Sequence, residues 1–195
     1  AHFRMPITVT ATVNISLKQN TETARFNMVE QQIRTWDVLD SRVLELVAQV
    51  PREQFVADAH KGLAFADVRL PLGQAQEMLC PREEARLVQA LNVQAGESVL
   101  VIGTGSGYIT ALLAHLARHV YSVDIVPEFI QAASARLQAL NLGAKVTLEV
   151  GDAANGWDHY GPYDAIAVTG SLESVSDNLK RSLKIGGRLF VIVGH

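Results

Sequence analysis

Ser98-Val-Leu-Val-Ile-Gly-Thr-Gly-Ser-Gly-Tyr108 is the stretch that decides the fold. Its apolar run, residues 99–102, has the length of a buried strand and ends in three glycines at alternate positions between 103 and 107. Apolar residues then recur at spacings of three and four across residues 109–116, which predicts a helix. A strand, a tight glycine turn and a helix form the first half of a βαβ unit, and the glycines let a ligand approach the backbone closely.

The rest of the C-terminal half repeats this alternation of strand and helix. Such alternation predicts an α/β fold, with a mostly parallel twisted sheet and helices on both of its faces. Ligands of such sheets bind at the carboxyl ends of the strands. The predicted strands are residues 120–123, 146–150, 163–168 and 188–193, and the predicted helices are residues 127–140 and a short one that carries Leu179 and Leu183.

The N-terminal half predicts helices that precede this core. Residues 24–35 have a helical pattern. Asp40 or Ser41 can cap a second helix that ends before Pro51, and residues 52–64 predict a further short helical stretch. We expect these helices to form an N-terminal helical cover, which packs on the core or closes over its cleft.

Residues 1–18 follow a different pattern, in which apolar residues alternate with threonine, asparagine and serine from Ile7 to Leu17. This period of two suits an amphipathic strand. It suits equally an extended arm, a cloning remnant or a misplaced translation start. We expect a peripheral segment, with residues 1–23 as an N-terminal extension of unknown role and residues 24–195 as the folded domain.

Residues 68–81 also break the helical pattern, because Pro71, Gly73 and Pro81 interrupt every helix or strand period. We therefore predict an ordered loop. The next helix begins at Pro81, since the first helical turn tolerates proline, and it runs to about Leu91.

The composition argues against several classes of protein. The chain has 195 residues, 48% of them apolar, which is enough for one domain with a full core. Its formal net charge is −3 and its 17 basic residues are scattered, so we expect no nucleic-acid partner. No apolar run reaches the roughly 18 residues that span a bilayer, and no secretory signal is recognised, so we expect no membrane partner and a cytoplasmic location. The single cysteine agrees with a reducing compartment, and the oligomeric state is not predicted.

The spacing of the glycines narrows the ligand. A dinucleotide fingerprint would place its third glycine at Tyr108, and no Gly-Lys-Ser/Thr follows as in a phosphate-binding loop. Asp124 lies 17 residues after Gly107 at the end of the next strand, where a carboxylate can accept both hydrogen bonds of a ribose diol. An adenosyl compound without a pyrophosphate fits these features, and S-adenosylmethionine is the candidate. Asp152, or the backbone beside it, follows the third strand and can meet the adenine amino group.

Each of these residues also has a simpler interpretation, as part of a tight turn. Their joint position at the ends of successive strands favours the cofactor interpretation. The predicted cofactor-binding residues are Gly103, Thr104, Gly105, Ser106, Gly107, Asp124, Ile125, Asp152, Ala153 and Thr169. No metal site is predicted, because the histidines lack ligand spacing such as His-Glu-x-x-His.

Several motifs together resemble the protein-L-isoaspartate O-methyltransferase family. The resemblance covers residues 24–195, and the Leu-Pro-Leu-Gly-Gln segment is its specific part, since many methyltransferases share the glycine motif. The matching motifs are Val50-Pro-Arg-Glu-Gln-Phe-Val56, Leu70-Pro-Leu-Gly-Gln-Ala-Gln76, Val99-Leu-Val-Ile-Gly-Thr-Gly-Ser-Gly-Tyr108, Gly151-Asp152 and Tyr163-Asp-Ala-Ile-Ala-Val-Thr169.

The resemblance implies a Rossmann-like class I methyltransferase fold and a cytosolic enzyme of protein repair. Such an enzyme methylates the free carboxylate of L-isoaspartyl residues in damaged proteins and peptides, its partners, and converts S-adenosylmethionine to S-adenosylhomocysteine. The methyl ester then closes to a succinimide, which can reopen to normal aspartate. The family's substrate loop corresponds here to Pro71, Leu72, Gly73, Gln74, Gln76 and Leu79.

The chain departs from the family pattern at three places. The family loop continues as Thr-Ile-Ser-x-Pro, and Leu79 occupies the position of the serine, so no catalytic residue is assigned. Cys80 lies one residue further, at a helix start that can lower a thiol pKa, although a buried inert thiol is the simpler interpretation. Val101 stands where the family has an acidic residue. The family also continues through further strands after residue 194, so we expect a C-terminal segment to be missing.

Leu79 keeps two alternatives to the repair activity open. In one, a divergent relative binds the cofactor and serves as a binding or regulatory module. In the other, the transferase chemistry is retained and the acceptor is different.

Overall fold

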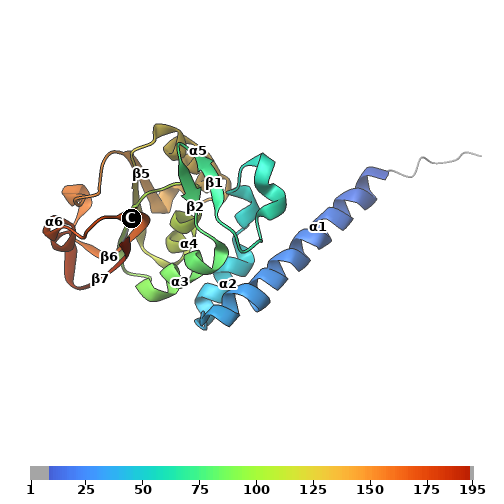
Figure 1. Cartoon of the computed structure of the whole chain (residues 1–195), viewed down its shortest axis with the longest axis horizontal. Helices are drawn as coiled ribbons and strands as arrows, with labels where there is room; N and C mark the ends of the chain where they lie inside the picture. Colours follow the sequence, from blue (N-terminus) through green and yellow to red (C-terminus); the bar gives the residue numbers. More distant parts are fainter. Residues whose placement is uncertain (1–8, 194–195) are drawn as a thin grey trace, which may run out of the picture.

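The computed structural model describes residues 9–193, with side chains from residue 17 onward, and its centre is a five-stranded parallel sheet. The strand order is β5-β4-β3-β6-β7. This confirms the predicted α/β fold with a parallel sheet. Figure 1 shows the neighbouring strands β6 and β7 near the C-terminal end of the chain. The strands are β3 (Ser98–Ile102), β4 (His119–Asp124), β5 (Val146–Val150), β6 (Tyr163–Leu172) and β7 (Leu183–Val193).

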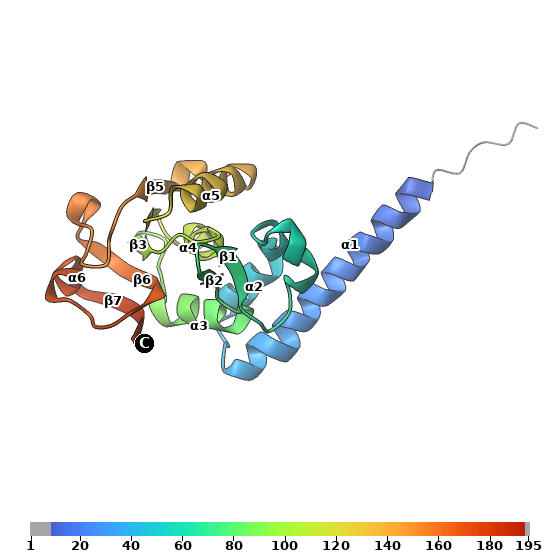
Figure 2. The same cartoon turned by 45° about the horizontal axis from the view of Figure 1, so that its top comes forward.

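Helices cover both faces of the sheet, as predicted. Side chains alternate along β3, so that Val99 and Val101 pack on one face and Leu100 and Ile102 on the other. The first face carries α3 (Pro81–Leu91), α4 (Tyr108–Leu116) and α5 (Pro127–Ala139), which lie together in Figure 2. The second face packs against Leu179 of the short α6 (Asp177–Arg181) and against the segment around the short 3-10 helix η6 (Asp158–Tyr160).

Two boundaries in the second half differ from the prediction. β6 does not end at Thr169 but continues to Leu172, although its pairing with β3 ends where Ile102 meets Val168. Thr169 therefore still lies just beyond the carboxyl end of β3. Leu183 begins β7 and does not belong to the helix of Leu179, because α6 ends at Arg181.

The N-terminal segment is helical, so the strand interpretation of its alternating pattern is wrong. Helix α1 covers Val9–Asn27 and continues into a π-helical turn, η1 (Met28–Ile33), and a 3-10 turn, η2 (Arg34–Trp36). Figure 1 shows the start of α1 projecting away from the sheet, which agrees with a peripheral segment. α1 has no break between residues 23 and 24, so that domain boundary stays a prediction, and residues 1–8 lie outside the described part.

The next helices pack on the core. Asp40 caps α2 (Ser41–Gln49) by accepting a hydrogen bond from the Arg42 N–H, as predicted. Two 3-10 helices follow, η3 (Arg52–Gln54) and η4 (Asp58–Leu63), and a further one, η5 (Gly143–Lys145), precedes β5. α2 and η1 contact α3 on the first face of the sheet. No helix among residues 9–193 has both the length and the apolarity to span a bilayer.

Residues 70–78 form a β-hairpin, where we predicted an ordered loop. β1 (Leu70–Gly73) pairs antiparallel with β2 (Gln76–Met78), with Leu70 opposite Met78. The two turn residues, Gln74 and Ala75, have φ values of 53° and 56°. Such a two-residue left-handed turn matches the twist of a hairpin, but it is ordinarily signalled by Asn-Gly or Asp-Gly. Strands this short, joined by these residues, leave no recognisable period in the sequence.

Candidate functional site

A cleft with a volume of about 220 Å³ opens at the carboxyl ends of β3, β4 and β6. It is the place that the α/β topology predicts for a ligand. Nine of the predicted site residues line it: Leu72, Gln76, Gly103, Gly105, Asp124, Ile125, Asp152, Ala153 and Thr169.

The glycine turn at the base of the cleft is held by contacts that no other residue would allow. Gly103 has a φ of +91°, and a Cβ there would lie 2.4 Å from the Thr169 hydroxyl. That hydroxyl donates a hydrogen bond of 2.6 Å to the Gly103 carbonyl. At Gly107, a Cβ would lie 2.9 Å from the Cβ of Ala133 on α5. The turn therefore has no space for side chains at these two positions.

Asp124 is buried beside this turn, with 8% of its surface exposed. Its Oδ2 accepts a hydrogen bond of 2.9 Å from the Gly105 N–H, and its Oδ1 accepts one of 3.0 Å from the Val126 N–H. Each carboxylate oxygen has two lone pairs, so the carboxylate can still accept two hydroxyl groups of a ligand. Asp124 thus both fixes the glycine turn and presents acceptors to the cleft.

Thr104 and Ser106 are buried and shape the turn from below. The Thr104 and Ser122 hydroxyls share a hydrogen bond of 2.7 Å, and Ser122 shares another of 2.9 Å with Thr110. The Ser106 hydroxyl accepts a hydrogen bond from the Tyr108 N–H at the start of α4. Both residues line a small cavity of about 30 Å³ beside the main cleft, while Gly107 lines neither.

The outer wall of the cleft combines apolar surface with one turn carboxylate. Ile125 is 65% exposed there, which is unusual for an isoleucine, and Ala153 is buried. Asp152 accepts a hydrogen bond of 3.0 Å from the Ala154 N–H, so it is a turn residue as well as a wall residue. Phe129 also lines the cleft, and its place in the first turn of α5, just after Asp124, could have indicated this.

The hairpin lies over the glycine turn and separates the cleft from a second cavity of about 430 Å³. A Cβ at Gly105 would lie 3.2 Å from Cδ1 of Leu72, so β1 contacts the turn directly. Gln74, at the hairpin tip, lines none of these cavities. The second cavity is lined by Arg69, Pro71, Gly73, Ala75, Gln76, Glu77, Leu79, Thr169, Gly170, Ser171 and Ile192.

Leu79, Cys80 and Val101, which the departures from the family pattern involve, lie in different parts of the structure. Leu79 is buried, with 7% of its surface exposed, and lines both the second cavity and the small one. Cys80 is buried at the N-terminus of α3, and burial raises the pKa of its thiol. This contradicts a lowered thiol pKa and agrees with an inert thiol. Val101 is fully buried in β3 and faces the helices rather than the cleft.

A buried ion pair that we did not predict joins the segments around the site. Arg52 is fully buried, and its guanidinium donates to the Glu84 carboxylate at 2.8 Å and to the carbonyls of Leu79 and Ala64. The same group lies 5.7 Å from the centre of the Tyr108 ring. Burial raises the pKa of Glu84 to about 7, whereas Arg52 lowers it; Glu84 in turn keeps the pKa of Arg52 above its ordinary value against the effect of burial. The one available signal was the position of Arg52 inside the motif of residues 50–56.

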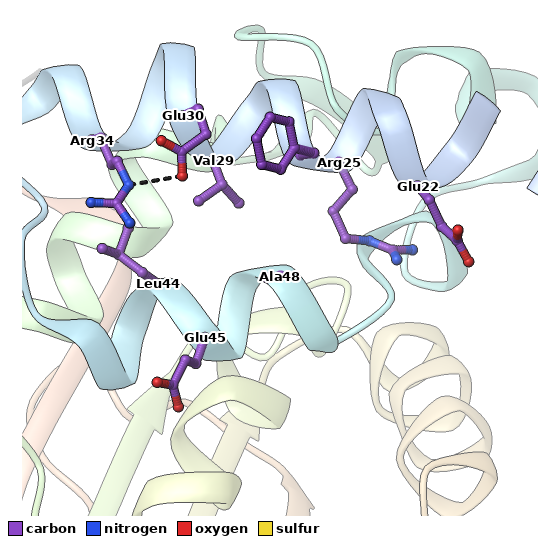
Figure 3. Close-up of a pocket in the computed structure, with 9 residues that line it drawn as sticks. Glu22, Arg25, Val29, Glu30, Arg34, Leu44, Glu45 and Ala48 are labelled. Atoms are coloured by element: carbon purple, nitrogen blue, oxygen red, sulfur yellow. Dashed lines mark hydrogen bonds and ion pairs between the residues drawn. The ribbon is translucent and has the colours of Figure 1, made fainter. Parts of the chain in front are cut away.

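A further hollow lies between the N-terminal helix and α2, outside the residues predicted for the site (Figure 3). Arg34 and Glu30 form an ion pair on its rim, and Val29 and Leu44 point into it. It shares no lining residue with the cleft.

Comparisons with known proteins agree with this geometry. The model of the protein-L-isoaspartate(D-aspartate) O-methyltransferase family matches residues 23–195. A protein-L-isoaspartate O-methyltransferase of Magnetococcus marinus is 40% identical over 173 residues, which cover 89% of this chain and 75% of that protein. The corresponding protein of Rhodopseudomonas palustris is 41% identical, over 86% of this chain and 76% of its own length.

Solved structures share the fold. One protein-L-isoaspartate O-methyltransferase superimposes with a TM-score of 0.73 at 24% identity, over 88% of this chain and 54% of its own length. A Plasmodium falciparum protein described as such a methyltransferase, in complex with S-adenosyl-L-homocysteine, gives 0.72 at 16% identity, over 90% of this chain and 84% of its own. The family match and the relatives at about 40% identity go beyond the fold, and the chain belongs to the protein-L-isoaspartate(D-aspartate) O-methyltransferase family.

Proposed function

We propose that this protein transfers the methyl group of S-adenosylmethionine to the free carboxylate of L-isoaspartyl residues in damaged proteins and peptides. The observation that carries the proposal is the cleft at the glycine turn, which adjoins a second cavity under the hairpin. One cavity fits a cofactor and the other an acceptor, with a shared wall. A cytoplasmic location and the lack of a nucleic-acid partner stay predictions from composition.

The residues of the cleft fit an adenosyl cofactor. Asp124 retains acceptor capacity for a ribose diol, Ile125 and Phe129 offer apolar surface to a planar base, and Asp152 lies beside them. When bound, S-adenosylmethionine supplies an electrophilic methyl group, and S-adenosylhomocysteine is the product.

The acceptor explains why this chain needs no general base. An α-carboxyl group has a pKa of roughly 3 to 4, so the isoaspartyl carboxylate is already ionised at pH 7. What the protein contributes is alignment of the two reactants and exclusion of competing orientations, which is a proximity effect. The hairpin, which contacts the glycine turn through Leu72, is placed to hold the acceptor over the cleft.

Incubation with labelled S-adenosylmethionine and an isoaspartyl peptide tests the proposal. Label in the peptide is the expected result. Cofactor binding in a calorimeter without methyl transfer would contradict the repair activity and favour a binding module, which Leu79 motivates. Transfer to a different acceptor would favour the second alternative.

Replacing Asp124 by alanine is expected to weaken S-adenosylmethionine binding by about 1.5–3 kcal/mol, roughly 10- to 150-fold, because charge-assisted hydrogen bonds are lost. Isothermal titration calorimetry measures this. Asp124→Asn removes the negative charge but keeps one side-chain oxygen, which can still accept the hydrogen bond from the Gly105 N–H. This variant therefore distinguishes the effect of the charge from the effect of losing that hydrogen bond. Asp58→Ala, at an exposed carboxylate outside the cleft, is the control. Unchanged affinity in Asp124→Ala would remove this residue from the site.

Replacing Leu79 by serine is expected to raise kcat/KM for an isoaspartyl peptide about tenfold, the effect of one hydrogen bond to a charged group. Leu79 fills space on the wall of the acceptor cavity and offers no donor. Met78→Ser is the matched control, because Met78 is equally buried but does not line that cavity. A folded Leu79→Ser protein with unchanged activity would show that Leu79 is not an obstacle.

A further inference from the structure

Glu77 occupies the junction of all the cavities around the site. The residue belongs to β2 of the hairpin and lines the main cleft, the second cavity and the small cavity. Of the described residues, only Glu77 and Thr169 line all three. Thr169 is engaged with the Gly103 carbonyl. Among the described residues, Glu77 is therefore the one charged residue that borders all three cavities.

The charge of Glu77 is not compensated. Within residues 17–193 its carboxylate has no hydrogen-bond or ion-pair partner, and the residue is exposed. Arg69, the cation that lines the second cavity, is committed elsewhere, because its guanidinium contacts both carboxylate oxygens of Glu83, at 2.6 and 3.1 Å. Glu77 raises the pKa of Arg69 only as a minor contributor, after Glu83. Because Arg69 is paired with Glu83, the Glu77 carboxylate is an unpaired negative charge on a residue that lines the second cavity.

This charge opposes an anionic acceptor unless the acceptor brings a compensating group. The carboxylate that receives the methyl group is itself ionised at pH 7. A second negative charge on the neighbouring residue of the peptide adds to the repulsion, and a positive charge relieves it. For unit charges about 6 Å apart and an effective dielectric constant between about 20 and 80, the change is about 3- to 100-fold in affinity for each unit of charge.

We propose that Glu77 determines specificity for the sequence around the damaged residue, selecting isoaspartyl peptides that carry lysine or arginine beside the isoaspartate over those that carry an acidic residue there. This inference rests on the proposed function, and it adds the charge class of the preferred acceptor. The basic side chain would lie over the hairpin, close to the Glu77 carboxylate.

The test uses two short isoaspartyl peptides that differ only in a lysine or a glutamate next to the isoaspartate. Their kcat/KM values are measured with S-adenosylmethionine, and their affinities with the protein saturated with S-adenosylhomocysteine. Wild-type protein is expected to prefer the lysine peptide by at least about tenfold at low salt, because the two peptides differ by two units of charge beside Glu77. Glu77→Gln should reduce this ratio at least threefold, and added salt should reduce it in the wild type. Because the ratio compares two peptides on one protein, changes in cofactor affinity cancel.

Glu45→Gln is the matched control, because it removes the same charge from an exposed position on α2 that lines none of these three cavities. It should leave the ratio unchanged. An equal ratio in wild type and Glu77→Gln would overturn the inference. Peptide binding without methyl transfer would overturn the proposed function, while the affinity ratio would still decide on Glu77. Failure of both peptides to bind would overturn both.

Discussion

Gly103→Ala is expected to reduce methyl transfer by about 100-fold, the scale on which misplacement of a reacting group by about 1 Å lowers the rate. Alanine at a φ of +91° is strained by about 1–3 kcal/mol. Its Cβ would also lie 2.4 Å from the Thr169 hydroxyl, which would have to leave the Gly103 carbonyl. Because the turn forms the base of the cleft, relief of this clash must move the backbone that faces the cofactor.

A second substitution separates the clash from the strain. Thr169→Ala removes the hydroxyl, and in the double variant the new methyl group at 103 has space again, so part of the lost affinity for S-adenosylmethionine should return. Gly96→Ala is the control, because no atom lies within 4 Å of a Cβ there and its φ is not left-handed. Calorimetric affinity and thermal unfolding would be measured for all variants. Wild-type affinity in Gly103→Ala would show that the turn does not hold the cofactor.

The centre of the sheet could be predicted because β3 is buried along its whole length. A buried parallel strand is a continuous apolar run, as in residues 99–102, and the helices between such runs have their own period. The glycine turn also helps to fix the register between β3 and β4, since the Gly103 N–H donates a hydrogen bond to the Val123 carbonyl near the end of β4. The apolar run and the helical period are local patterns, so both can be recognised in the sequence without knowledge of the fold.

The hairpin and the N-terminal helix could not be predicted from the same kind of signal. The hairpin turn places Gln74 and Ala75 in left-handed conformations that neither residue favours, so tertiary contacts such as that of Leu72 with the glycine turn must stabilise it. Residues 9–17 alternate like a strand, yet they form the start of α1. Among the described residues, no strand pairs with this segment, so its alternating pattern does not lead to a β-strand.

The residues that line the cleft could be predicted where they follow strand ends, and could not be predicted where packing brings them there. Asp124 and Thr169 follow apolar runs, and both reach the cleft. In the sequence, Glu77 is one polar residue among several in an irregular segment, and only the folded chain brings three cavities together beside it. Arg52 comes from a segment far from the glycine turn, and only the folded chain brings it to Glu84 and Leu79.

Arg52→Met is expected to lower the free energy of unfolding by about 3–5 kcal/mol, the usual effect of removing one partner of a buried ion pair. Arg52 and Glu84 are both almost fully buried, so the remaining carboxyl group would have neither a partner nor solvent. The carbonyls of Ala64 and Leu79 would lose their donor as well. Urea unfolding measures the change, with Lys61→Met as the control. Lys61 pairs with Asp58 on the surface, where loss of the pair should change stability by no more than about 1 kcal/mol.

Arg52→Met/Glu84→Leu tests what the pair does beyond satisfying its own charges. Removal of both charges should recover part of the lost stability, because the buried unpaired carboxyl is gone. The carbonyl of Leu79 still lacks a donor in this variant, so the hairpin end of the acceptor cavity should stay displaced and KM for an isoaspartyl peptide should stay raised.

Arg52→Lys would keep the charge but lose the planar guanidinium that reaches three acceptors at once. If Arg52→Met were no less stable than Lys61→Met, the buried pair would not join these segments. If the double variant had wild-type KM, Arg52 would stabilise the fold without positioning Leu79.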